Sequence, residues 1–250
     1  MAASAIISVT IISMAAISKR GFIDFHAHCL PGIDDGAKDV PMAQAMLRTA
    51  AKQGAHTVVA TPHFYWGQDT VESFLQHRRE AVERLRPHVD GAMPRVRMGA
   101  EVLIREGISR VDLRPLSLEG TDILLAELPF MPPPGWLVEE LENIAYTQRR
   151  TIMLAHLDRY MPWYAARHLE PLLELPDVIV QINAESLADR RYFRSLKRWL
   201  PEVERMVLGS DMHNVTNRAP LLQQAVRTLE RSRTGREWLS IIENTEDELF

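Results

Sequence analysis

Short, continuous apolar segments alternate with longer amphipathic segments along most of this chain. Continuous apolar runs are typical of parallel strands that are buried on both faces, and amphipathic segments are typical of the helices that cover them. The strands are expected at residues 21–25, 57–60, 96–103, 122–126, 151–155, 178–182 and 206–208. The helices are expected at residues 42–53, 72–89, 136–149, 165–173, 190–200 and 220–232.

About seven such units predict an α/β fold with parallel strands and right-handed crossovers. A closed or nearly closed barrel is the simplest architecture, and a doubly wound open sheet is the alternative. Gly54 is the expected cap of the first helix, and the second helix should bury Phe74, Leu75, Val82, Leu85 and Val89. No linker divides the chain, so we expect a single domain over residues 21–250.

Composition excludes several classes of partner. The net charge of -4 gives no sign of a nucleic-acid or anionic-membrane partner, and 46% hydrophobic residues are ordinary for a soluble protein. Cys29 is the single cysteine, which rules out an internal disulfide and fits a reducing, cytoplasmic compartment.

Residues 1–20 form an uncharged apolar and hydroxylated stretch that ends in Lys19 and Arg20. A secretory signal would carry positive charge ahead of its apolar run, and a membrane span needs about 20 apolar residues. We therefore expect a loosely ordered or peripheral leader without stable membrane insertion, with an amphipathic, membrane-associating segment as the alternative. Met14 is a possible second translation start.

Most expected strands end in a histidine or a carboxylate. His26 and His28 leave the first strand on the same side, because side chains alternate in direction along an extended backbone. In parallel α/β folds, functional residues gather at the carboxyl ends of the strands. The other residues at such ends are Asp34 or Asp35, His63, Glu101, Glu127, His156, Asp211 and His213. The remaining histidines, 56, 77, 88 and 168, are interpreted as surface or packing residues.

Carboxylates such as Glu101 and Glu127, in or after apolar strands, are costly to bury unless a cation neutralises them. Imidazole and carboxylate ligands without thiolate suit Mn, Fe or Zn. About nine candidate ligands exceed the needs of one ion, so two or three divalent metals are predicted. Clustered metals lower the pKa of a bound water and neutralise phosphate oxygens, which favours phosphoester hydrolysis.

Arg159 and Arg218 follow His156 and His213 in the post-strand loops, where a guanidinium fork would match phosphate oxygens. They are the candidate catalytic phosphate clamp. Cys29 suggests a thiolate phosphatase instead, but that chemistry needs an arginine six residues further on, where the chain has Asp35. We therefore interpret Cys29 as a small buried residue.

Several short motifs together resemble one known family. They are Asp24-Phe25-His26-Ala27-His28, Pro31-Gly32-Ile33-Asp34-Asp35-Gly36, Ala60-Thr61-Pro62-His63, Gly99-Ala100-Glu101-Val102, Ala126-Glu127-Leu128-Pro129 and Ser210-Asp211-Met212-His213-Asn214. Their order resembles the PHP (polymerase and histidinol phosphatase) superfamily. The Gly-Ile-Asp-Asp-Gly and Glu-Leu-Pro segments resemble its bacterial protein-tyrosine-phosphatase branch, the CpsB/YwqE type.

The resemblance implies a distorted TIM-like (β/α)7 barrel of the PHP type with a trinuclear centre, manganese being the first expectation. His26, His28, Glu101 and Asp211 would hold one metal. Glu101 would bridge to a second metal, which Glu127 and His156 hold. Asp35, preferred to Asp34, would hold the third metal with His63 and His213. Arg159 and Arg218 match arginines that contact phosphate in this branch.

Two positions depart from the family pattern. His156-Leu157-Asp158-Arg159 replaces the usual His-Pro-Glu-Arg, and without proline a less rigid loop is expected. Glu185 stands where a small residue is usual, and a carboxylate there would disfavour anionic substrates or recognise a cationic group.

The expected function is hydrolysis of phosphotyrosine in protein by a metal-bound hydroxide, with Arg159 and Arg218 stabilising the transferring phosphoryl group. The resemblance implies a tyrosine kinase tail in capsule or exopolysaccharide regulation as the substrate, and homo-oligomerisation is possible. The alternatives are a phosphatase of a small phosphomonoester or nucleotide, and a non-catalytic, metal-stabilised scaffold that binds a kinase.

Overall fold

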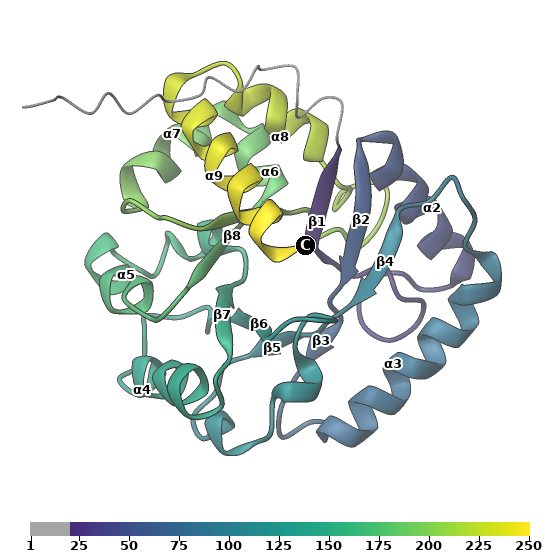
Figure 1. The fold of residues 1–250 in the computed structure, drawn as a ribbon, viewed down its shortest axis with the longest axis horizontal. Coiled ribbons are helices and arrows are strands. Elements are labelled where there is room, and N and C mark those ends of the chain that lie inside the picture. The colour runs from purple at the N-terminus through teal and green to yellow at the C-terminus, as the bar shows by residue number, and fades with distance from the viewer. Residues whose placement is uncertain (1–20) are drawn as a thin grey trace, which may run out of the picture.

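Parallel strands occupy the middle of the molecule and helices surround them (Figure 1). This computed structural model describes residues 21–250, so the expectations for residues 1–20 lie outside the described part of the chain. The strands are β1 Phe22–Ala27, β2 Ala55–Ala60, β3 His63–Phe64, β4 Arg95–Met98, β5 Glu101–Leu103, β6 Ile123–Glu127, β7 Thr151–Leu154, β8 Ile179–Asn183 and β9 Met206–Gly209.

The strands form two parallel sheets, β1-β2-β4 and β3-β5-β6-β7-β8-β9. Backbone hydrogen bonds join the sheets at both ends. Between β1 and the segment after β9, the Asp211 N–H donates to the His26 carbonyl (2.8 Å) and the His28 N–H donates to the Met212 carbonyl (3.0 Å). At the other junction, Glu101 N–H donates to the Pro62 carbonyl (3.0 Å). The strands therefore close into a distorted barrel with seven strand positions, as predicted, and the open-sheet alternative is wrong.

Two of the seven strand positions are broken. Residues 96–103 were expected to form one strand, but β4 and β5 belong to different sheets and Gly99-Ala100 separates them. β3, which continues β2 beyond Pro62, was not predicted. A Cβ atom on Gly99 would lie 2.5 Å from a Leu118 methyl carbon, so any larger residue here would force the Leu118 side chain to move. The break lets Glu101 begin a new strand.

The helices largely follow the predicted pattern. They are α2 Val40–Lys52, α3 Val71–Leu85, α4 Leu137–Glu142, α5 Ala166–Leu173, α6 Ala184–Ala188, α7 Arg190–Trp199, α8 Leu222–Leu229 and α9 Arg233–Leu249. Gly54 follows the cap residue of α2 with a φ of 97°, a left-handed conformation that glycine adopts without strain.

Several details of the helix predictions are wrong. The helix expected over residues 136–149 is α-helical only in α4 and continues as a π-helical turn, Asn143–Thr147. Val89 lies beyond α3 and is 41% exposed, because the chain turns through Arg86–His88 before reaching it. His56 lies within β2, not before it, and its side chain is exposed. The helices α6 and α9 were not predicted.

Helix α9 covers the amino ends of the strands, opposite the end where the predicted ligands lie. Figure 1 shows it crossing in front of the strands, with the C-terminus beside β1. Its Thr245 hydroxyl accepts a hydrogen bond from Met206 N–H (3.2 Å), at the start of β9. Leu249 packs against the apolar side chains inside the barrel, which include Phe25 and Met153. Helix α9 therefore closes one end of the barrel and leaves the other end for chemistry.

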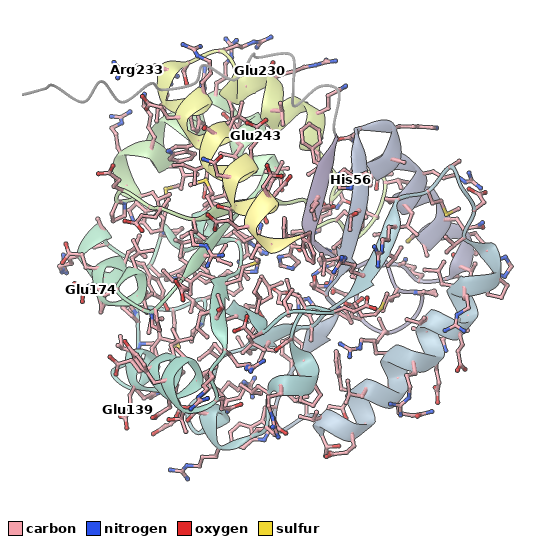
Figure 2. All side chains as sticks on the ribbon, in the orientation of Figure 1. His56, Glu139, Glu174, Glu230, Arg233 and Glu243 are labelled. Atoms are coloured by element: carbon pink, nitrogen blue, oxygen red, sulfur yellow. The ribbon has the colours of Figure 1, made fainter. Side chains whose placement is uncertain are left out.

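Side chains fill the space between the strands and the helices (Figure 2). The labelled Glu139 and Glu174 lie on the outer surface of α4 and α5 (Figure 2). Within residues 21–250, no helix is long and apolar enough to cross a membrane.

Candidate metal centre

The structure brings all nine predicted ligand residues together at the carboxyl end of the barrel. His26 and His28 come from the end of β1, His63 and Glu101 from the starts of β3 and β5, and Glu127 from the end of β6. His156, Asp211 and His213 follow β7 and β9, and Asp35 lies in the turn after β1. Four overlapping groups hold ligand atoms within 4.8 Å of one another. These groups are His28/Asp35/His63/His213, His26/His28/Asp211, His26/Glu101/His156 and His63/Glu101/Glu127.

The Nε2 atoms of His26 and His28 face each other at 3.1 Å. In neutral rings, the form that metal ligands take, the partners of the Nδ1 atoms decide which nitrogen carries the single proton. The amide oxygen of Gln181 accepts the backbone N–H of His156 (2.7 Å), so it must also accept from His26 Nδ1 (3.0 Å). The Asp34 carboxylate likewise accepts from His28 Nδ1 (2.7 Å). Each Nδ1 is therefore the protonated nitrogen, and two Nε2 lone pairs point at one space. Such an arrangement needs a cation.

His213 repeats this pattern. Its Nδ1 donates to the backbone carbonyl of Asp211 (2.9 Å), which leaves a lone pair on Nε2. That Nε2 atom lies 3.2 Å from an Asp35 carboxylate oxygen, and His63 Nε2 lies 3.3 Å from the same oxygen. A lone pair facing a carboxylate is repulsive unless a positive ion lies between them.

The Glu101 carboxylate is fully buried at the centre of the cluster. One of its oxygens lies 3.2, 3.3 and 2.9 Å from nitrogens of His26, His28 and His63, and the other lies 2.7 Å from His156 Nε2. Burial and the nearby Glu101 charge raise the pKa of Glu127 to about 8. A divalent ion would hold both side chains in the carboxylate form.

The cluster also leaves buried polar atoms without a hydrogen-bond partner. They are His63 Nδ1, Glu101 Oε2, His156 Nδ1 and His213 Nε2. Buried polar atoms are rarely left unpaired, so a cluster of them at one centre suits metal coordination, which would use the lone pairs that no hydrogen bond occupies. Cys29 is absent from all four groups, and burial raises the pKa of its thiol to about 12. The residues fit divalent ions that bind nitrogen and oxygen ligands.

Asp34 and Asp35 take different positions. Asp34 is buried against the outer nitrogen of His28 and also accepts the N–H of Gly36 (2.9 Å), so it orients a ligand. The Asp35 side chain is 63% exposed and faces the cluster through His63 and His213. Of the two aspartates, Asp35 is the one whose carboxylate lies in a group of candidate ligands, together with His28, His63 and His213.

The two predicted arginines converge on Asp211. Arg159 Nη1 donates to Asp211 Oδ2 (3.1 Å), and Arg218 Nη2 donates to both carboxylate oxygens (3.1 and 3.0 Å). Their side chains are 41% and 34% exposed, so they lie at the open rim of the cluster. A ligand entering from solvent would meet both guanidinium groups beside the candidate metal ligands.

The backbone is strained at two candidate ligands. His156 has a φ of 31° and Asp211 a φ of 51°, values that residues other than glycine rarely adopt. Such conformations persist only where the surrounding structure enforces them, and they concentrate at functional sites. At Asp211 the enforcing contacts include the hydrogen bond from its N–H to the His26 carbonyl.

The loop without proline is held by Asp158. This carboxylate is fully buried and accepts from Asn183 N–H (2.9 Å) and the Ser186 hydroxyl (2.5 Å). The Tyr192 hydroxyl donates to the Asp158 carbonyl (2.7 Å). The 3₁₀ turn that carries Arg159, Leu157–Tyr160, is thus anchored by side chains. Glu185 lies on α6, after β8, with an exposed side chain.

The residues that orient the candidate ligands were not predicted from the sequence. Gln181 and Asn183 lie on β8 and are buried; Gln181 holds His26, and Asn183 Nδ2 donates to Asp211 (3.2 Å). Asp24 accepts hydrogen bonds from the N–H and hydroxyl of Ser210 (2.7 and 2.6 Å), next to Asp211. The sequence signal that could have identified these three residues is a polar side chain within an otherwise apolar strand segment.

The chain matches one known protein family over nearly all of its described length. The family model for capsular polysaccharide synthesis, CpsB/CapC, matches residues 22–248. The chain belongs to the CpsB/CapC family. Its relatives include the tyrosine-protein phosphatase YwqE of Bacillus subtilis, 32% identical over 218 residues that cover 84% of each chain. Another is the tyrosine-protein phosphatase CpsB of Streptococcus pneumoniae, 26% identical over 221 residues, covering 81% of this chain and 87% of that one.

The fold agrees with that of a solved CpsB/CapC-type structure. It comes from work on YwqE of Bacillus subtilis and CpsB of Streptococcus pneumoniae, described as metal-dependent tyrosine phosphatases. The TM-score is 0.72 with 25% identity, over 90% of this chain and 92% of the other. Both the family and the barrel predicted from the sequence are confirmed.

Proposed function

We propose that this chain is a metal-dependent phosphatase that removes phosphate from phosphotyrosine in proteins, with residues 21–250 as its phosphoesterase domain. One observation carries the proposal. Imidazole lone pairs and buried carboxylates converge on one space, with two arginines at its open rim. Relatives in the CpsB/CapC family named tyrosine-protein phosphatases support the choice of substrate.

The ligand assignment is the one that the family resemblance implies, and the four groups in the cluster contain the same nine residues. His26, His28, Glu101 and Asp211 would hold one metal, and Glu101 would bridge to a second metal at Glu127 and His156. Asp35, His63 and His213 would hold a third metal, since their ligand atoms lie together around His28. Two or three divalent ions would therefore bind, with manganese as the first expectation and iron or zinc as alternatives. When bound, they would polarise phosphate oxygens and lower the pKa of an attacking water.

The chain's own residues position the substrate. Arg159 and Arg218 would turn from Asp211 toward the phosphoryl oxygens, whose charge their forked N–H groups match. Asn183 would remain on Asp211 and keep that carboxylate oriented. As charge shifts within the phosphoryl group during the reaction, both arginines would stabilise it from the rim.

The biological setting is an extension of the same proposal. A phosphotyrosyl protein in capsule or exopolysaccharide synthesis is the expected partner, such as the tail of a bacterial tyrosine kinase. We place the reaction in the cytoplasm, and homo-oligomerisation remains a prediction. Membership of the CpsB/CapC family, a family of capsular polysaccharide synthesis, supports this setting.

The substrate is tested by comparing kcat/KM for a phosphotyrosyl peptide and for small alkyl phosphomonoesters or nucleotides, with Mn supplied. We expect the peptide to be strongly preferred. A preference for a small phosphomonoester or nucleotide would leave the metal chemistry intact and refute the protein substrate. No hydrolysis of any aryl phosphate with Mn supplied would favour the non-catalytic scaffold.

Arg218→Lys separates binding of the phosphoryl group from binding of metal. Lysine keeps the positive charge but loses the fork, so we expect kcat/KM for an aryl phosphate to fall about 10²-fold. Metal content should stay unchanged, because Arg218 is not a ligand. Arg236→Lys, an exposed arginine on α9, is the matched control and should leave both quantities unchanged.

A further inference from the structure

An aromatic cleft opens beside the metal centre. Its volume is about 520 Å³, within the range of about 300–1,000 Å³ that is usual for small-molecule sites. Its lining includes Tyr65, Phe130, Met131 and Trp136, together with the candidate ligand Glu127. A second cleft of about 540 Å³, near the start of α3, contains none of the candidate metal ligands. The aromatic cleft, whose lining includes Glu127, therefore adjoins the candidate metal centre.

Two aromatic rings flank this cleft, and each stacks on a candidate ligand. Tyr65 lies parallel to His63, with ring centroids 5.2 Å apart and an interplanar angle of 18°. Phe130 stacks on His156 at 5.6 Å and on Tyr160 at 5.0 Å. Their positions in the cleft are thus set by the metal cluster itself.

The Phe130 ring also lies next to the proposed phosphate clamp. The Arg159 guanidinium carbon lies 4.9 Å from the centroid of this ring. Phe130 and Met131 are 38% and 52% exposed, which is unusual for large apolar side chains. An exposed aromatic surface within reach of a phosphate-binding arginine suits a ligand that is anionic at one end and aromatic at the other.

We infer that this cleft binds the aromatic ring of the substrate, with Phe130 and Trp136 as the residues that make the enzyme prefer aryl over alkyl phosphates. The inference rests on the proposed function, because a phosphoryl group held by Arg159 and the metals would direct its ester oxygen past Glu127 into the cleft. An alkyl phosphate would leave these aromatic surfaces exposed to water and gain nothing from them.

Phosphonates test the inference without bond cleavage. The dissociation constants of phenylphosphonate and methylphosphonate would be measured by calorimetry on the Mn-loaded protein. We expect the wild-type chain to bind phenylphosphonate more tightly, and Phe130→Ala and Trp136→Ala each to reduce this preference about 10-fold. Phe130→Tyr, which keeps the aromatic ring, should retain the preference for phenylphosphonate. Tyr146→Ala, an aromatic truncation at a 63% exposed position outside the cleft, is the matched control and should not change it.

Two outcomes would overturn the inference. One is an unchanged preference in both cleft variants, and the other is an equal loss of affinity for both phosphonates, which would indicate a structural role. The ratio of kcat/KM for phenyl phosphate to that for ethyl phosphate should change in parallel, since comparing variants cancels the intrinsic difference in leaving groups. Failure of the proposed metal-dependent hydrolysis is distinguishable, because it would abolish hydrolysis of both esters while phosphonate binding could still be measured. Failure of the protein substrate alone is distinguishable through the phosphotyrosyl peptide, whose kcat/KM would be low while the preference for phenylphosphonate persisted.

Discussion

At the scale of single residues, protonation of the histidine rings is set by their outer partners. Gln181, Asp34 and the Asp211 carbonyl accept from the Nδ1 atoms of His26, His28 and His213. Spacing along a strand predicts that two imidazoles point the same way, but it does not reveal these partners. The residues that gather in the cluster were therefore predictable from sequence, whereas the groups that orient them were not, because those contacts cross between strands.

Asp34→Asn tests this dependence. Asparagine fills the same space but loses the negative charge that holds the Nδ1 proton of His28, so metal affinity should fall about 10- to 100-fold. The affinity would be measured by Mn titration, with circular dichroism to verify the fold. Asp122→Asn, at an exposed position before β6, is the control. Unchanged affinity in Asp34→Asn would show that His28 needs no partner.

At the scale of elements, α4 contributes stability through one carboxylate. Glu140 is buried and accepts hydrogen bonds from the backbone N–H groups of Gly107 (2.6 Å) and Ser109 (2.9 Å). Burial acts to raise the pKa of Glu140, but these two hydrogen bonds lower it overall from its ordinary value of 4.5. The charged form is therefore the one that the fold stabilises.

Glu140→Gln should lower the free energy of unfolding by about 1–3 kcal/mol at pH 7. Because the folded pKa is depressed, the contribution of Glu140 is complete above the unfolded pKa and is lost as the pH falls through the folded pKa. The difference between the two proteins should thus shrink below about pH 4.5. Urea unfolding at several pH values would measure it, with the exposed neighbour Glu139→Gln as control (Figure 2). A difference that is constant with pH would contradict the charge argument.

At the scale of the whole molecule, one end of the barrel gathers buried groups that repel one another unless cations are bound between them. Glu101, Glu127 and Asp211 are buried at one end of the strands, and several imidazole lone pairs face the same space. Metal removal should therefore destabilise the folded chain, because bound ions stabilise only the native state; at 100 times Kd the stabilisation is about 2.7 kcal/mol. Thermal unfolding with and without chelator would measure this effect. An equal Tm in both conditions would contradict it. The control is a variant that lacks three candidate ligands, with Glu101→Gln, His28→Ala and Asp211→Asn. If chelator lowers the Tm of this variant as much as that of the wild type, the effect is non-specific.

The alternation of apolar and amphipathic segments was sufficient to predict the barrel, since it reflects burial on both faces of parallel strands. It did not predict every element, and two of the omissions have clear physical reasons. The break at Gly99 lies inside a segment that was expected to be one strand, and Gly99 packs closely against Leu118 there. Helix α9 was missed because its charged residues obscure the apolar positions, such as Trp238 and Ile242, that it buries.

The most direct test of the metal centre is elemental analysis of the purified chain, combined with turnover of p-nitrophenyl phosphate before and after chelation. We predict two or three equivalents of divalent metal per chain, loss of turnover when the metal is removed, and recovery when Mn is returned. Full turnover in the metal-stripped protein would contradict the account.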